Sequence, residues 1–289
     1  MIGRLAVIGV GLIGGSVAGG LKRAGRVGEV VGWGRTPANL QTALDRGLID
    51  RAADSAAAAV AAADLVLLAA PVASIPPLLR EISPALPAEA TLTDVGSTKA
   101  WLLAQAQQVL PPAQFARFVP GHPIAGTEHA GAAAAQLDLF AGRTVILTPI
   151  EQTVPAALAG VRAMWQALGA TVVEQSPAAH DQLLALTSHL PHVLSYALAS
   201  TLEDGESPAA LAPAIGGGLR DMTRIAGSDV RMWRDILLSN REAVERALTA
   251  YRRHLDALEA AVAAAEPARL EQLLAHGRAL RRRLLEETE

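Results

Sequence analysis

The chain has 289 residues, of which 51% are hydrophobic and 18% are charged, so it can bury the cores of about two domains. Its 25 basic and 28 acidic residues give a formal net charge of −3, which offers no basic field to nucleic acid or to an anionic membrane surface. The absence of cysteine excludes disulfides, thiolate metal sites and a cysteine nucleophile, and it fits a cytoplasmic location. No segment offers about 20 uninterrupted apolar residues, so no membrane span is expected.

The first part of the chain alternates short apolar runs with helical segments. Strands are expected over residues 5–8, 29–33, 64–70, 91–94, 118–120, 144–148 and 171–174. Helices are expected over residues 16–24, 37–46, 99–109 and 155–168. Such alternation favours a parallel sheet with helices on both faces, so residues 1–175 are predicted to form an α/β domain.

The second part of the chain, from residue 176 to residue 289, contains no good strand. Its helices are expected over residues 178–202, 209–215, 229–265 and 268–287. Pro191 should kink or split the first of these helices, and the run Gly216–Gly218 should interrupt the helical pattern. The expected helix 229–265 is longer than a helix needs to be to cover the core of one small domain. An all-α domain that forms a homodimer is therefore predicted.

A dinucleotide-binding fingerprint opens the chain as Gly9-Val10-Gly11-Leu12-Ile13-Gly14. The expected strand 5–8 enters this loop and a helix leaves it, which is the context the motif requires. The first glycine allows the tight turn, the second lets the backbone approach a pyrophosphate, and the third allows close packing of helix on strand. The sequence therefore predicts that residues 1–175 form a Rossmann-type domain that binds a nicotinamide dinucleotide.

The type of nicotinamide cofactor depends on the end of the second expected strand. An NAD site places Asp or Glu there to hold the ribose 2′-hydroxyl, and this segment, residues 31–36, contains neither. Arg35 and Thr36 could instead hold a 2′-phosphate, which favours NADP over NAD. Alternatively, Arg35 is a solvated loop charge, or it stacks on the adenine without selecting the cofactor.

Polar residues gather in segments that an Ala- and Leu-rich chain does not need for folding. These segments are 93–99, 121–128, 188–192, 216–224 and 232–235. The first two follow expected strands, where open α/β sheets bind their ligands.

Each candidate side chain in these segments also has a structural interpretation. His122 could cap a turn, and Arg224 could pair with Asp221 or Asp229. His189 and His192 share a helix face, but no third metal ligand is evident, so no metal site is expected.

In combination these motifs resemble the prephenate dehydrogenase family, which includes the arogenate and cyclohexadienyl dehydrogenases. The resemblance runs from the Gly9 loop to about residue 235 and depends most on segments 121–128, 188–192 and 216–224. It implies a Rossmann domain followed by a helical dimerisation domain. It also implies oxidative decarboxylation of prephenate to 4-hydroxyphenylpyruvate, or of arogenate to tyrosine, with NAD or NADP. The choice between the two substrates stays open.

The resemblance also implies roles for particular side chains. His122 would accept the substrate hydroxyl proton, a role that a neutral imidazole suits near neutral pH. Ser97 would hydrogen-bond His122 and help to orient the nicotinamide. Arg224 would hold a substrate carboxylate as a planar fork, and His189 would line the substrate pocket.

Two further groups complete the expected site. Thr127 and Glu128 would lie at the mouth of the substrate pocket. The expected cofactor contacts are Gly9, Gly11, Leu12, Ile13, Gly14, Arg35, Thr36, Pro71 and Ser97.

Two other classes of protein remain as alternatives. A β-hydroxyacid dehydrogenase or imine reductase of similar layout would need a catalytic lysine on the first long helix of the second domain. Residues 178–202 contain no lysine. A non-catalytic dinucleotide sensor would keep the glycine loop and would need neither His122 nor Arg224.

Overall fold

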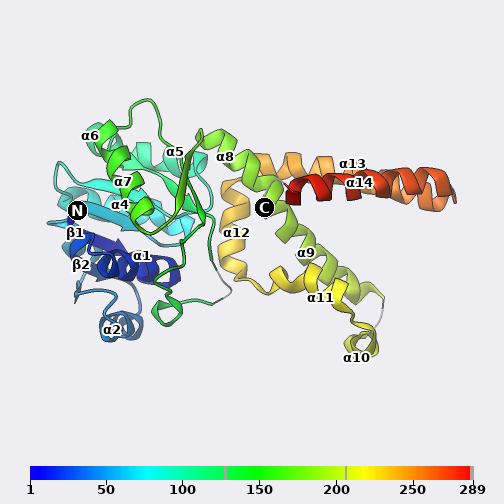
Figure 1. The fold of residues 1–289 in the computed structure, drawn as a ribbon, viewed down its shortest axis with the longest axis horizontal. Coiled ribbons are helices and arrows are strands. Elements are labelled where there is room, and N and C mark those ends of the chain that lie inside the picture. Colours follow the sequence, from blue (N-terminus) through cyan, green and yellow to red (C-terminus); the bar gives the residue numbers. More distant parts are fainter. Residues whose placement is uncertain (127–128, 206, 287–289) are drawn as a thin grey trace. The chain divides into compact units, whose positions relative to one another are not determined.

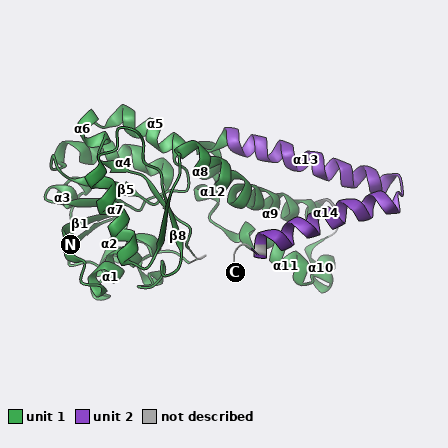
Figure 2. Cartoon of the chain, turned by 45° about the horizontal axis from the view of Figure 1, so that its top comes forward, with its two compact units in different colours: residues 1–241 green, residues 242–289 purple. Residues whose placement is uncertain are grey.

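A computed structural model of the chain describes residues 1–126, 129–205 and 207–286 (Figure 1). By its internal contacts the chain divides into two compact units, Met1–Arg241 and Glu242–Glu289 (Figure 2). All the described candidate site residues belong to the first unit.

The first unit is built around a parallel sheet of six strands in the order β3-β2-β1-β4-β5-β6. This is the strand order of a doubly wound dinucleotide-binding sheet, and the order reverses between β1 and β4. The predicted α/β class is therefore confirmed. The strands are β1 (Ile2–Ile8), β2 (Val27–Trp33), β3 (Arg51–Ala52), β4 (Leu65–Leu68), β5 (Thr91–Asp94) and β6 (Phe118–Val119).

From Leu5 to Ile8, strand β1 is buried on both faces, which explains the continuous apolar sequence of that part. Leu5 and Val7 belong to one hydrophobic cluster, and Ala6 and Ile8 belong to the other. The first cluster contains residues of helices α1 (Leu12–Arg23), α2 (Pro37–Asp45) and α7 (Pro155–Ala167). The second contains residues of α3 (Ala56–Val60), α4 (Ile75–Ile82) and α5 (Ala100–Val109).

Several elements of this domain were not expected from the sequence. The two-residue strand β3 is too short to give a periodic signal. Helix α4 starts at Ile75 and carries Pro76 and Pro77 in its first turn, where a missing N–H costs no helical hydrogen bond. A further short helix, α6 (Pro112–Phe115), precedes β6.

A second, smaller sheet carries the segment that contains His122. Strand β7 (Gly121–Pro123) pairs antiparallel with β8 (Thr144–Leu147), which pairs in parallel with β9 (Thr171–Glu174). The sequence had placed His122 after a strand. It lies instead within β7, opposite Ile146.

The remainder of the first unit is helical, and the structure describes no strand between residues 176 and 286. The predicted interruption near Pro191 takes the form of a π-helical turn, Ala185–His189. Pro191 has no N–H, and its ring crowds the carbonyl four residues earlier, so a regular α-helix cannot continue through it. The helices are α8 (Pro177–Leu184), α9 (Leu190–Thr201), α10 (Pro208–Leu211), α11 (Gly217–Thr223) and α12 (Val230–Ser239).

Two helix expectations need correction. The glycine run interrupts the helical pattern only at its first residue, because Gly216 is the N-cap of α11 and Gly217 and Gly218 belong to that helix. The expected single helix 229–265 is two helices, α12 and α13 (Arg241–Ala263), which meet at Asn240. The side chain of Asn240 bonds to groups of α8 and of the π turn, which explains the break.

The second unit consists of most of α13 together with α14 (Pro267–Glu286). It exposes several large apolar side chains, namely Leu255, Val262, Leu274 and Leu280. Among the helices that the structure describes, none is both long and apolar enough to cross a lipid bilayer.

The close packing of α1 against β1 leads to a testable prediction about stability. A Cβ at Gly14 would lie 2.2 Å from the Gly9 carbonyl oxygen and 2.9 Å from Val7 Cγ1, whereas a Cβ at Gly11 would meet no atom within 4 Å. We expect Gly14→Ala to lower the free energy of unfolding by about 1–3 kcal/mol or more, because the added methyl overpacks the helix–strand contact. Gly11→Ala is the matched control and should change it by less than about 1 kcal/mol. Denaturant unfolding measures both, and equal effects would contradict this packing.

Candidate active site

The glycine loop between β1 and α1 has the geometry that a dinucleotide requires. Gly9 has φ +101°, and a Cβ there would lie 2.4 Å from the Ala69 carbonyl oxygen, so only glycine fits. Gly14 has no room for a side chain either, while Gly11 faces open space. The first and third glycines are therefore fixed by packing, and the second leaves the backbone accessible to a ligand.

The N-terminus of α1 is free to face an anion. No side chain caps this end of the helix, and its first turn contains no acidic residue. Unpaired backbone N–H groups and the helix dipole favour a phosphate at such a position. Of the other expected cofactor contacts, Leu12 is buried, Ile13 is partly buried and Pro71 is exposed after β4. The residues present fit a dinucleotide pyrophosphate.

Arg35 and Thr36 follow β2 and are both exposed. Within the described ranges the Arg35 guanidinium forms no ion pair or hydrogen bond. Nearby, the Asn39 amide donates to the Val10 carbonyl at 2.6 Å and accepts from the Ala132 N–H at 2.7 Å. Asn39 thereby fixes the loop beside the glycine fingerprint and leaves Arg35 available.

A buried ion pair lies at the carboxyl end of β5. Lys99 and Asp94 are both fully buried, and Lys99 Nζ lies 2.6 Å from Asp94 Oδ2. Lys99 Nζ also donates to the Gly121 carbonyl at 2.8 Å, and Asp94 accepts from the Gly96 and Gly121 N–H groups. Burial raises the pKa of Asp94 and lowers the pKa of Lys99, and their mutual attraction opposes both shifts. The pair ties β5, the start of α5 and the start of β7 together.

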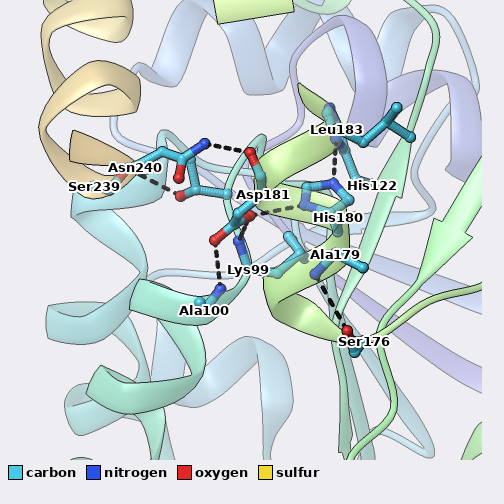
Figure 3. A network of polar contacts seen from close by, with 12 residues as sticks. Lys99, Ala100, His122, Ser176, Ala179, His180, Asp181, Leu183, Ser239 and Asn240 are labelled. Atoms are coloured by element: carbon cyan, nitrogen blue, oxygen red, sulfur yellow. Dashed lines mark hydrogen bonds and ion pairs between the residues drawn. The ribbon is translucent and has the colours of Figure 1, made fainter. Parts of the chain in front are cut away.

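His122 belongs to a chain of hydrogen bonds that extends from β7 into α8 (Figure 3). His122 Nδ1 lies 2.9 Å from His180 Nε2, and His180 Nδ1 lies 2.8 Å from Asp181 Oδ1. His122 Nε2 makes no hydrogen bond to the part of the chain that the structure describes. Among the described residues Ser97 and His122 form no hydrogen bond, and His122 Nδ1 is bonded to His180 instead. Ser97 is half-buried in the loop after β5.

Asp181 links the helical segment to the Rossmann domain. Its carboxylate accepts from the Lys99 N–H at 2.8 Å and from the Ala100 N–H at 2.9 Å, and so caps α5, which has no side-chain cap of its own. The Asp181 carbonyl accepts from the Asn240 amide at 2.8 Å. One buried residue therefore connects α5, α8 and the junction between α12 and α13.

His189 ends the π-helical turn and is buried. Asn240 Nδ2 lies 3.1 Å from His189 Nδ1, and His189 Nε2 is buried with no hydrogen-bond partner among the described residues. Burial lowers the pKa of His189 to about 4, so the side chain is neutral near pH 7. A buried donor without a partner in this cluster is a candidate contact for a substrate oxygen.

Trp233 and His192 form the other side of this cluster. The His192 ring stacks on Trp233 with centroids 3.5 Å apart, and its Nδ1 lies 2.9 Å from the Ser188 carbonyl oxygen. His192 is thus held by stacking on Trp233 and by one hydrogen bond. Arg224 is exposed and forms no ion pair with Asp221 or Asp229 in the described contacts. Burial lowers the pKa of His192, and the charge of Arg224 acts in the same direction.

The environment of His122 keeps its imidazole neutral. Burial lowers its pKa well below the usual 6.5, and charge on His180, Lys99 and His189 acts in the same direction. Burial also lowers the pKa of His180, although the hydrogen bond to Asp181 opposes that shift. The cluster therefore contains an uncharged histidine with one ring nitrogen unused, which is what a general base requires.

Sequence reasoning found some of these residues and missed others. It found His122, His189 and the glycine loop, but gave no role to His180 and Asp181. The sequence signal that could have indicated these two residues is an adjacent His-Asp pair at the start of an otherwise apolar helix. Thr127 and Glu128, expected at the pocket mouth, lie outside the described residues.

A parallel sheet in this order, with a glycine-rich loop after its first strand, defines a Rossmann-type dinucleotide-binding protein, here followed by a helical segment. Residues 17–174 match the family model "Prephenate dehydrogenase, nucleotide-binding domain", and residues 176–276 match "Prephenate dehydrogenase, dimerization domain". The chain belongs to the prephenate dehydrogenase family.

Individual relatives agree with this assignment. The chain is 36% identical to a cyclohexadienyl dehydrogenase of Zymomonas mobilis over 90% of this chain and 88% of that protein. It is 37% identical to a prephenate dehydrogenase of Bacillus subtilis over 83% of this chain, a match that spans 65% of that relative. The crystal structure of prephenate dehydrogenase from A. aeolicus with hydroxyphenyl propionate and NAD+ superimposes with a TM-score of 0.92 and 35% identity. That match covers 98% of this chain and 99% of the other.

The buried ion pair gives a stability prediction. We expect Lys99→Met to lower the free energy of unfolding by about 3–5 kcal/mol, because it leaves the Asp94 carboxylate buried without its cation. The matched control is Lys22→Met, which removes a partly exposed pair with Asp50 and should cost less than about 1 kcal/mol. Denaturant titration compares the two variants, and similar losses would contradict the structural role given to Lys99.

Proposed function

We propose that this chain catalyses the oxidative decarboxylation of prephenate to 4-hydroxyphenylpyruvate, or of arogenate to tyrosine, with NAD or NADP. The observation that carries the proposal is the neutral, half-buried His122, whose Nε2 is unused. It belongs to the same compact unit as a glycine loop that fits a dinucleotide. Membership of the prephenate dehydrogenase family supports it further.

The glycine loop and the N-terminus of α1 would hold the pyrophosphate of the cofactor. When bound, the nicotinamide supplies the acceptor for the hydride that leaves the hydroxyl-bearing carbon of the substrate. Ser97 follows β5 at the carboxyl edge of the sheet and is proposed to contact the nicotinamide. Arg35 and Thr36 are proposed to lie beside the adenosine ribose, where a guanidinium favours a 2′-phosphate.

His122 is the proposed general base. Its Nε2 would accept the proton of the substrate hydroxyl as the carbon–hydrogen bond breaks. The bond to the ring carboxylate then breaks, CO2 leaves, and the bonding electrons complete the aromatic ring. The ring oxygen takes up a proton again to give the phenol. The reaction therefore requires one group that accepts a proton at a fixed position and one that orients the substrate ring. A fixed imidazole can supply the first role, and a cation can supply the second.

The substrate contacts are proposed from the helical segment. Arg224 is exposed and unpaired within the described contacts, so its guanidinium is available for a substrate carboxylate. The buried Nε2 of His189 is available for a second substrate oxygen. Thr127 and Glu128 remain proposed contacts at the mouth of the pocket.

We further propose that residues 1–175 bind the dinucleotide and that residues 176–289 bind the substrate and form the dimer, in line with the two family models. The exposed apolar residues of α13 and α14 favour a homodimer through the helical part. The cysteine-free composition is compatible with the proposed cytoplasmic location.

Turnover tests the proposed reaction. Purified protein should reduce NAD or NADP in the presence of prephenate or arogenate, followed by the absorbance of the reduced nicotinamide. His122→Asn should lower kcat by about 10²–10⁴-fold, because the hydroxyl proton loses its acceptor. His254→Gln, at an exposed position of α13, is the control for loss of a histidine. Full turnover by His122→Asn would show that another group is the base, and no turnover in any combination would reject the function.

Cofactor choice is tested at Arg35. If its guanidinium binds a 2′-phosphate, Arg35→Ala should raise the KM for NADP by about 10–100-fold and change the KM for NAD less than about twofold. Arg80→Ala, at an exposed position of α4, is the matched control. An equal change with both cofactors would make Arg35 a general contact and would remove the argument for NADP.

A further inference from the structure

The hydrogen bonds around Asp181 fix where the proton of His180 lies. Asp181 Oδ1 accepts from the Lys99 N–H, and Oδ2 accepts from the Ala100 N–H. Backbone N–H groups can only donate, so both carboxylate oxygens act as acceptors. His180 Nδ1, 2.8 Å from Oδ1, must therefore carry a hydrogen.

This fixes the tautomer of His122 in turn. A neutral imidazole carries one N–H, so a His180 protonated at Nδ1 presents an unprotonated Nε2. That atom lies 2.9 Å from His122 Nδ1, which must then be the donor. A neutral His122 with its hydrogen on Nδ1 has a free lone pair on Nε2, the ring nitrogen without a partner in the described contacts.

We infer that His180 and Asp181 are positioning residues, which hold His122 in the tautomer whose Nε2 can accept the substrate hydroxyl proton. The inference rests on the proposed function, because the free lone pair on Nε2 has this role only if His122 is the general base. Neither residue needs to touch the substrate.

The fold places both side chains for this task. Ser176 caps α8 by accepting from the Ala179 N–H, and His180 and Asp181 follow in the next turn. Adjacent helical side chains project about 100° apart. His180 therefore reaches β7, and Asp181 reaches the N-terminus of α5, as Figure 3 shows. One turn of α8 therefore forms hydrogen bonds both to β7, the strand of His122, and to α5, the helix that follows β5.

The same arrangement stabilises the product of proton transfer. Once Nε2 has accepted the proton, His122 is a cation with hydrogens on both ring nitrogens. His180 Nε2 remains an acceptor for the Nδ1 hydrogen, and the Asp181 carboxylate lies behind His180. The positive charge is thus stabilised through two hydrogen bonds without any further proton transfer.

Nitrogen NMR of the ligand-free protein tests the tautomer directly. The protein is labelled with ¹⁵N-histidine and studied at a pH well above the pKa of free imidazole. The His122 signals are identified by their loss in His122→Asn. We expect the hydrogen of His122 on Nδ1 in the wild-type protein. A hydrogen on Nε2 would overturn the inference, and this measurement requires no turnover.

Two variants of His180 connect the tautomer to catalysis. His180→Leu removes the acceptor, so His122 should lose its single tautomer and kcat should fall by about 100-fold or more, with little change in the KM of the substrate. His180→Gln keeps an amide oxygen for His122 and an amide N–H for Asp181. It should retain the Nδ1 tautomer and recover kcat to within about tenfold of wild type.

The outcomes separate the inference from the proposed function. Full kcat in a folded His180→Leu protein, or a His180→Gln protein as inactive as His180→Leu, would overturn the positioning role. If His180→Leu fails to fold, the wild-type tautomer and the His180→Gln variant still decide. Wild-type protein with the Nδ1 tautomer but no turnover of prephenate or arogenate would contradict the function and leave the tautomer assignment intact.

Discussion

The buried ion pair between Lys99 and Asp94 is the constraint on which the site depends. Two charges without solvent access are tolerated because they pair with each other and make further hydrogen bonds, and the partners for these bonds come from the β5–α5 loop and from Gly121. Gly121 immediately precedes His122. The electrostatic requirement of the pair therefore fixes the backbone that carries the proposed base, and any relaxation of the pair would move His122.

A second buried carboxylate extends this constraint into the helical segment. Asp181 satisfies two backbone donors of α5 and one ring nitrogen of His180, and its own carbonyl bonds Asn240. The break between α12 and α13 lies at the residue whose side chain makes that bond. The helical segment is thus attached to the Rossmann domain through specific polar groups as well as apolar packing, and this positions His189 in the same cluster.

The sequence predicted those features that local pattern determines. Strands 91–94 and 171–174 have the expected bounds, because four-residue runs rich in Thr, Val and Leu and bounded by turn residues are typical of strands. The glycine loop follows from spacing and context. The role of His180 was not predictable, because it depends on His122, which lies 58 residues away, and on a carboxylate that bonds backbone 82 residues away. Spacing along a chain does not indicate such contacts. Strand β7 was missed because its Gly121 and Pro123 are residues typical of turns.

The π turn at Ala185–His189 has a consequence for how this segment tolerates changes in length. A π turn contains one residue more than the α-turn it replaces, and each residue rotates a helix by about 100°. In a regular α-helix an extra residue turns everything beyond it by about that angle, whereas the wider π turn takes up the extra residue locally. Extra residues are usually accommodated in surface loops, but here the π turn lets a buried helical segment carry one residue more while His189 still meets Asn240, which also bonds Asp181.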